Sequence, residues 1–288
     1  MRNIRMNFHS KPHTYVGQVH LLVSDLERSI TFYKEMIGFQ VLEQTKNQAV
    51  LTADGTTPLL TIEQPEGVQS KQPRTTGLYH FALLLPNRKE LAKALLHLLQ
   101  NRYPMQGASD HSVSEALYLA DPDGNGIEIY RDRPADMWNW QDDQVFMDTR
   151  RLDVESLLAE AEGEVWTGLP KETVMGHIHL HVADLRATEE FYIQALGFDV
   201  VLRYGPQALF TSTGRYHHHI GLNVWNGVGA PAPKPNSVGM KYFTLLLPNE
   251  EARVATVARL QQLGAYVVEK NGIAITRDPS GNEVHLLV

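Results

Sequence analysis

The stretch Gly176-His177-Ile178-His179-Leu180-His181-Val182 decides how the rest of this chain is interpreted. Three histidines alternate with three apolar residues, which is the two-residue period of a half-buried β-strand. The imidazoles therefore share one face of the predicted strand, and the apolar side chains share the other. A single histidine there would most often be an ordinary polar residue, but three in register are typical of one wall of a metal site. We predict a metal-binding role for at least one of them.

The composition narrows the classes of function. The chain has 288 residues, of which 43% are hydrophobic and 20% charged, so it can form two domains of common size. A net charge of -7 without a basic stripe argues against nucleic acid and anionic membranes as partners. The absence of cysteine excludes disulfides and thiolate metal sites, and it fits a cytoplasmic protein. No apolar run is long enough to cross a bilayer.

The chain also repeats itself. The predicted strand Val16–Val23 and the predicted helix Glu27–Gly38 recur 159 residues later, where Asp184 matches Asp25. A second segment recurs as well, because residues 79–87 match residues 241–249. Each copy of this second segment leads through Pro-Asn to a predicted helix, then to an Asp-Pro-x-Gly turn and a last strand that carries glutamate. Such internal similarity outweighs any local assignment of secondary structure.

The repeats divide the chain into modules, each of one strand, one helix and further strands. We expect four of them, at about residues 14–66, 77–131, 174–227 and 238–288. The first two would form an N-terminal domain over residues 10–131, and the last two a C-terminal domain over residues 174–288. Residues 132–173 are interpreted as a linker with one helix, Asp153–Glu162. Two tryptophans of this linker, Trp138 and Trp140, are interpreted as packing residues.

This organisation resembles the vicinal oxygen chelate superfamily, which includes glyoxalases, bleomycin-resistance proteins and extradiol dioxygenases. The resemblance implies an α+β fold in which four βαβββ modules form two cup-shaped mixed β-sheets with helices outside. The chain looks most like two-domain catechol 2,3-dioxygenases. The motifs that carry this resemblance are Gly77–Phe81, the run from Asp110 to Glu128, Gly176–Val182 and Tyr216–Asn223. The second of them follows the extradiol pattern: His, five residues, Leu-Tyr, two residues, Asp-Pro-x-Gly, three residues, Glu.

The resemblance also implies which residues bind the metal. The superfamily's ligand positions fall on His177, His80 and Glu128. Two histidines and one carboxylate leave positions for substrate and O2, as in non-haem Fe(II) oxygenases. This set requires the second module to pair with the third, across the two halves of the chain. Pairing within the C-terminal half would instead give His177, His219 and Glu283, and the sequence leaves both arrangements open.

Other residues are expected to act on the substrate. We predict that His219 handles protons beside O2, because the pKa of histidine lies near neutrality. It would lie on a strand over Tyr216–Trp225, whose alternation places His218 on the apolar face. His111 and Tyr118 match family residues that hydrogen-bond the bound catecholate. The remaining histidines outside these patterns are interpreted as surface residues: His9, His13 and His97.

These features predict a metal-dependent extradiol dioxygenase that acts on a small aromatic diol with O2. Fe(II) is the expected metal, with Mn(II) as the second choice. A glyoxalase-like isomerase or lyase is the alternative enzyme, and it would add His219 as a fourth ligand and prefer Zn or Ni. A protein that only binds a small molecule, as in drug resistance, is a third hypothesis. A homo-oligomer is a further expectation, and no nucleic acid or membrane is expected as a partner.

Overall fold

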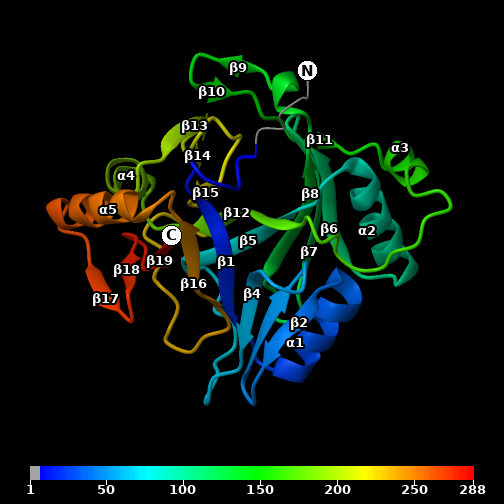
Figure 1. Cartoon of the computed structure of the whole chain (residues 1–288), viewed down its shortest axis with the longest axis horizontal. Helices are drawn as coiled ribbons and strands as arrows, with labels where there is room; N and C mark the ends of the chain where they lie inside the picture. Colours follow the sequence, from blue (N-terminus) through cyan, green and yellow to red (C-terminus); the bar gives the residue numbers. More distant parts are fainter. Residues whose placement is uncertain (1–6) are drawn as a thin grey trace.

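The computed structural model describes residues 7–288, and within this range the chain builds two large curled β-sheets (Figure 1). The eight-stranded sheet contains the strands of the first and fourth modules. In spatial order they are β17 (Val267–Lys270), β18 (Ile273–Arg277), β19 (Glu283–Leu287), β16 (Gly239–Leu246), β1 (Tyr15–Leu22), β4 (Pro58–Glu63), β3 (Gln48–Thr52) and β2 (Gln40–Gln44).

The nine-stranded sheet contains the strands of the second and third modules, with one short strand from the linker at its edge. In spatial order they are β11 (Arg150–Arg151), β6 (Met105–Asp110), β7 (Ser114–Ala120), β8 (Gly126–Asp132), β5 (Gly77–Leu84), β12 (Val174–His181), β15 (Ile220–Asn223), β14 (Ala208–Ser212) and β13 (Asp199–Tyr204). The linker also forms a small hairpin of β9 (Trp140–Gln141) and β10 (Gln144–Val145).

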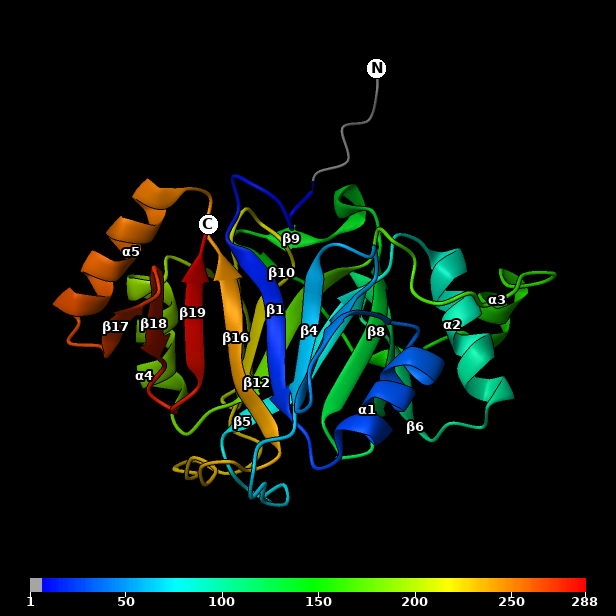
Figure 2. The ribbon, with the colours of Figure 1, turned by 60° about the horizontal axis from the view of Figure 1, so that its bottom comes forward.

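The helices lie outside the sheets, and Figure 2 shows α4 and α5 on one side of the molecule with α1 and α2 on the other. Each module's helix begins after an Asp or Asn whose side chain accepts the N–H three residues on, as an N-cap does. The helical segments are α1 (Leu26–Phe32), η1 (Tyr33–Ile37), α2 (Arg88–Gln100), η2 (Ala135–Met137), α3 (Val154–Ala159), α4 (Leu185–Glu190), η3 (Phe191–Ala195) and α5 (Glu250–Gln262). The predicted α+β architecture of four βαβββ modules is confirmed.

The strands of the two halves pair with each other. In the middle of the nine-stranded sheet, β12 runs antiparallel to β5, so the third module joins the second. In the eight-stranded sheet, β1 pairs in the same way with β16. Figure 2 shows β19, β16, β1 and β4 side by side across the molecule, although β4 and β16 are far apart in the sequence. Of the two arrangements that the sequence left open, the structure therefore has the exchanged one.

The residues that identified the repeat hold each half together. Tyr33 donates to Asp121 over 2.9 Å, and Tyr192 donates to Asp278 over 3.2 Å. Each aspartate opens an Asp-Pro-x-Gly turn and accepts backbone N–H groups of that turn with its other oxygen. The tyrosine of one module is therefore fixed to the turn of the next, while the strands pair across the halves.

One apolar core joins both sheets to the helices. Ile178 and Leu180 of β12 are fully buried in it, together with Phe81 of β5 and Phe243 of β16. Their strands therefore present the alternate residues, including His177 and His179, to the opposite face. Within residues 7–288, the helices are too short or too polar for any of them to span a membrane.

Candidate metal centre

Three adjacent strands of the nine-stranded sheet position the predicted ligands. Glu128 of β8 lies in register with Ala82 of β5, and Ala82 lies in register with His177 of β12. His80 is two residues from Ala82 on the same strand, so it projects from the same face. The small side chain of Ala82 separates the carboxylate from His177, which leaves room for the three longer side chains to converge.

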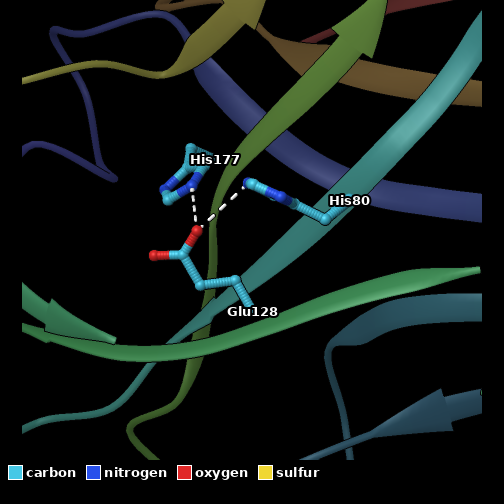
Figure 3. A group of neighbouring side chains, drawn as sticks. All are labelled: His80, Glu128 and His177. Carbon is cyan, nitrogen blue, oxygen red and sulfur yellow. Dashed lines mark hydrogen bonds and ion pairs between the residues drawn. The ribbon is translucent and has the colours of Figure 1, made fainter. Parts of the chain in front are cut away.

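The three side chains point toward one another (Figure 3). His177 Nε2 lies 3.2 Å from Glu128 Oε2, and His80 Nε2 lies 3.1 Å from the same oxygen. The three residues are between 1% and 6% exposed. Their ligand atoms lie within 4.8 Å of one another, and no other group of this kind was found among the described residues.

The electrostatics of this cluster favour the forms that bind metals. Burial alone would raise the pKa of the Glu128 carboxyl, but the imidazoles of His177 and His80 outweigh burial and hold that pKa well below its usual range. Burial lowers the pKa of His177, and the nearby carboxylate compensates only in part. At neutral pH the cluster therefore contains an ionised carboxylate beside a neutral His177 imidazole, and metal ligands must be deprotonated in this way.

The geometry fits a metal ion. His80 Nε2 is buried and has no hydrogen-bond partner among residues 7–288, although Glu128 Oε2 lies only 3.1 Å away. Two ligand atoms that are each about 2.1 Å from one ion, at right angles, lie about 3 Å apart. The two distances from Glu128 Oε2 have this value. Two histidines and one carboxylate are also the donor set of non-haem Fe(II) sites.

A cavity of about 490 Å³ opens beside this cluster, and both His80 and Glu128 line it. One wall is mainly apolar and comes from β13, β14 and the loop after β15. The other wall comes from β6, β7 and the linker and carries more polar groups. The apolar wall includes Leu202, Tyr204, Phe210 and Trp225, and the second wall includes Gln106, Ser109, His111, Tyr118, Met147 and Asp148. None of the described residues that line the cavity is Lys or Arg.

His111 and Tyr118, which were predicted to hydrogen-bond a catecholate, lie together in the cavity wall. His111 Nδ1 donates to the carbonyl of Asp148 over 2.8 Å, so its Nε2 accepts from the Tyr118 hydroxyl at 2.7 Å. Tyr118 also lies in register with Glu128. Burial first, and then the Glu128 carboxylate, raise the pKa of Tyr118 well above its usual value. The linker thus orients His111 through a backbone carbonyl, a contact that its sequence did not indicate.

The histidine at the cavity is His218, whereas His219 lies outside it. His219 Nε2 donates to the Phe8 carbonyl over 3.0 Å, and its Nδ1 accepts from Thr213 N at 3.3 Å. His218 lines the cavity, and its ring centroid lies 4.1 Å from that of His177. The predicted alternation over Tyr216–Trp225 was wrong because the regular strand begins only at Ile220. The residues before it form a loop, where strand periodicity does not apply.

The interpretation of His9 as a surface residue was also wrong. His9 is only 8% exposed, and its Nε2 donates to the Gly176 carbonyl over 2.8 Å. Burial lowers its pKa to about 4, although the bond to Gly176 opposes this shift. The N-terminal segment therefore supports β12 next to His177. His13 and His97 are half-buried.

The sequence of the four modules matches a known family. A family model for the Glyoxalase/Bleomycin resistance protein/Dioxygenase superfamily matches residues 15–129 and 174–286. The chain belongs to this superfamily. The two matched segments cover the four modules and leave out the linker, which in this superfamily member supplies part of the cavity wall.

Individual proteins are similar over almost the whole chain. A catechol-2,3-dioxygenase from Bacillus subtilis (strain 168) is 48% identical over 269 residues, which cover 92% of this chain and 94% of that protein. A solved structure from Bacillus subtilis subsp. subtilis str. 168 has a TM-score of 0.65 at 13% identity and covers 94% of this chain and 84% of its own. Glyoxalase I from Zea mays has a TM-score of 0.59 at 17% identity, and the match covers 95% of this chain and 92% of the Zea mays chain. These two structures support the fold alone.

The eight-stranded sheet lacks the ligand set of this superfamily site. Gln18 occupies the position of His177, and Tyr242 that of His80. His285 pairs with Thr244 as Glu128 pairs with Ala82, so His285 rather than Glu283 is the register equivalent of the carboxylate.

Glu283 instead binds Arg277 over 3.0 Å and His285 over 3.0 Å. Glu283 lies in the eight-stranded sheet, whereas His177 lies in the nine-stranded sheet. The alternative set of His177, His219 and Glu283 is therefore not brought together.

Proposed function

We propose that this protein is an extradiol dioxygenase that cleaves the ring of a catechol-type substrate with O2. A metal would be held by His80, Glu128 and His177, with Fe(II) as the first choice and Mn(II) as the second. The convergence of these three ligands beside the cavity carries the proposal. The 48% identity to a catechol-2,3-dioxygenase supports it over nearly the full chain.

Fe(II) bound by these ligands would supply the redox chemistry that ring cleavage by O2 requires. The residues of the chain bind and orient the substrate. A cavity of about 490 Å³ is of ordinary size for a small-molecule site, for which the range is roughly 300–1,000 Å³. The Tyr118 hydroxyl and the Glu128 carboxylate lie on neighbouring strands at its wall, so Tyr118 can hydrogen-bond a substrate oxygen close to the ligands. His111 holds that hydroxyl in place.

A histidine at the cavity would handle the protons of the reaction, and we assign this role to His218 instead of His219. Burial first, and then the His177 and His217 imidazoles, lower the pKa of His218 well below its usual value. His218 is therefore neutral before the substrate binds. A neutral imidazole beside the substrate can accept a proton from a catechol hydroxyl.

The walls of the cavity favour an uncharged catechol. The aromatic and aliphatic side chains of one wall can pack on the ring and on apolar ring substituents. Because none of the described lining residues is Lys or Arg, a carboxylate on the substrate would be buried without a cationic partner. We therefore propose catechol itself or catechols with apolar substituents as the substrates.

Loading with Fe(II) under anaerobic conditions, followed by catechol and air, tests the function. We expect the absorbance of a yellow ring-fission product to appear in wild-type protein and to be absent in His177→Ala. Binding of one metal ion per chain, without any ring-fission product from a panel of catechols, would contradict ring cleavage and favour an isomerase or lyase. Failure to bind metal would favour a protein that only binds a small molecule.

A further inference from the structure

A chain of hydrogen bonds leads away from the cavity through His218. Its Nδ1 lies 2.8 Å from Nδ1 of the next residue, His217. His217 Nε2 lies 2.7 Å from Asp132 Oδ1. His217 is fully buried, and the Asp132 side chain is 21% exposed, so the chain connects the cavity with a carboxylate near the surface. The metal-ligand cluster does not include these two residues.

The donors and acceptors give this chain a direction. An ionised carboxylate can only accept hydrogen bonds, so the proton between Asp132 and His217 lies on His217 Nε2. In its neutral form an imidazole carries a single proton, so the Nδ1 of neutral His217 is an acceptor. The proton between the two histidines therefore lies on His218 Nδ1. It follows that His218 Nε2 carries no proton.

A second donor fixes the carboxylate at the end of the chain. The Tyr216 hydroxyl lies 3.3 Å from the same Asp132 oxygen, and the Tyr130 hydroxyl lies 2.7 Å from that of Tyr216. Because Tyr216 donates to Asp132, Tyr130 donates to Tyr216. Two buried groups thus converge on Asp132 Oδ1 and hold the acceptor that orients His217.

We propose that Asp132 and His217 are positioning residues that fix the tautomer of His218, with its proton on Nδ1 and an unprotonated Nε2 available to the cavity. When a catechol binds, its O–H bond breaks and the Nε2–H bond of His218 forms, and the resulting imidazolium donates from Nδ1 to His217. The substrate in this step rests on the proposed function, whereas the tautomer of His218 follows from the protein alone.

Asp132→Asn tests the proposal because an amide can reverse the chain. If the amide NH2 donates to His217 Nε2, then His217 Nδ1 donates to His218, and His218 Nε2 holds the proton. In a serine protease, an Asp→Asn exchange that leaves the catalytic histidine in the wrong tautomer costs roughly 10⁴-fold in kcat. We expect kcat to fall by about 10²-fold or more, with a much smaller change in KM.

Nitrogen-15 NMR of the histidines in the full-length protein, with and without Zn²⁺, measures the tautomer directly. Wild type should show a protonated Nδ1 and an unprotonated Nε2 for His218, and Asp132→Asn should show the reverse. Asp132→Glu, which keeps the carboxylate, should restore the wild-type pattern in part. Asp199→Asn, at an exposed position of β13, is the matched control and should leave both spectrum and kinetics unchanged.

If Asp132→Asn fails to fold, His217→Phe replaces it, and it should remove the preference for the Nδ1 proton because phenylalanine cannot accept a hydrogen bond from His218. An unchanged His218 spectrum in a folded variant would overturn the proposal, as would a kcat close to wild type. Wild-type protein that shows the expected tautomer but cleaves no catechol would refute the proposed function and leave the assignment of His218 standing.

Discussion

The buried N-terminal histidine should make the metal-free protein sensitive to acid. His9 is 8% exposed, and its Nε2 donates to the Gly176 carbonyl beside the metal-ligand cluster. Glutamine is also able to donate a hydrogen bond to that carbonyl, and it does not titrate. We therefore expect His9→Gln to fold and to lose one source of acid sensitivity.

The magnitude follows from the difference in pKa between folded and unfolded chain. Burial lowers the pKa of His9 from 6.5 to about 4. Between these two values the unfolded chain binds a proton that the folded chain does not, so the free energy of unfolding falls as the pH falls. Each pH unit in this window costs about 1.4 kcal/mol. The loss from His9 is therefore negligible at pH 7 and about 2 kcal/mol at pH 5.

Urea unfolding at pH 7 and pH 5, with a chelator present, measures this loss. The free energy of unfolding should fall between the two pH values by about 2 kcal/mol less in His9→Gln than in wild type. His97→Gln, at a half-buried position on α2, controls for the loss of a histidine far from the cluster. An equal loss in wild type and His9→Gln would refute the reasoning.

Three further predictions concern the cavity and the ligands. Tyr118→Phe leaves His111 Nε2 without its donor, and we expect a loss of about 1–3 kcal/mol in unfolding free energy and a lower kcat, measured by urea unfolding and steady-state kinetics. Ala82→Leu places a larger side chain between Glu128 and His177, so it should cost about 1–3 kcal/mol and weaken metal binding in equilibrium dialysis. For 3,4-dihydroxybenzoate, kcat/KM should be at least about 10-fold below that for catechol, because a carboxylate gains no cationic partner in the cavity; an equal value would contradict an uncharged-substrate site.

The parts of the fold that follow local rules could be predicted from the sequence. The Asp and Asn caps, the Asp-Pro-x-Gly turns and the alternation of β12 each depend on residues close in the chain. The choice of partner module could not be predicted in this way. All four modules carry similar strands, so the same sequence pattern permits pairing within or across the halves.

The errors in placing site residues from the sequence each have a specific physical cause. His219 was expected at the cavity, where the structure has His218, because the strand was expected to begin before Ile220. His9 was missed because its partner, Gly176, lies 167 residues away, and nothing in the N-terminal segment indicates that contact. The spacing after the second Asp-Pro-x-Gly turn did contain the signal that His285, not Glu283, is the equivalent of Glu128. His285 lies seven residues after Asp278, just as Glu128 lies seven residues after Asp121.

Counting the metal ions bound per chain tests the central claim that ligands from both halves form one centre. Equilibrium dialysis of Fe(II) under anaerobic conditions should give one ion for wild type and strongly reduced binding for His80→Ala and for His177→Ala. His285→Ala in the eight-stranded sheet is the matched control and should bind as wild type does. Full binding by His80→Ala, or loss of binding in His285→Ala, would contradict a centre built from His80, Glu128 and His177.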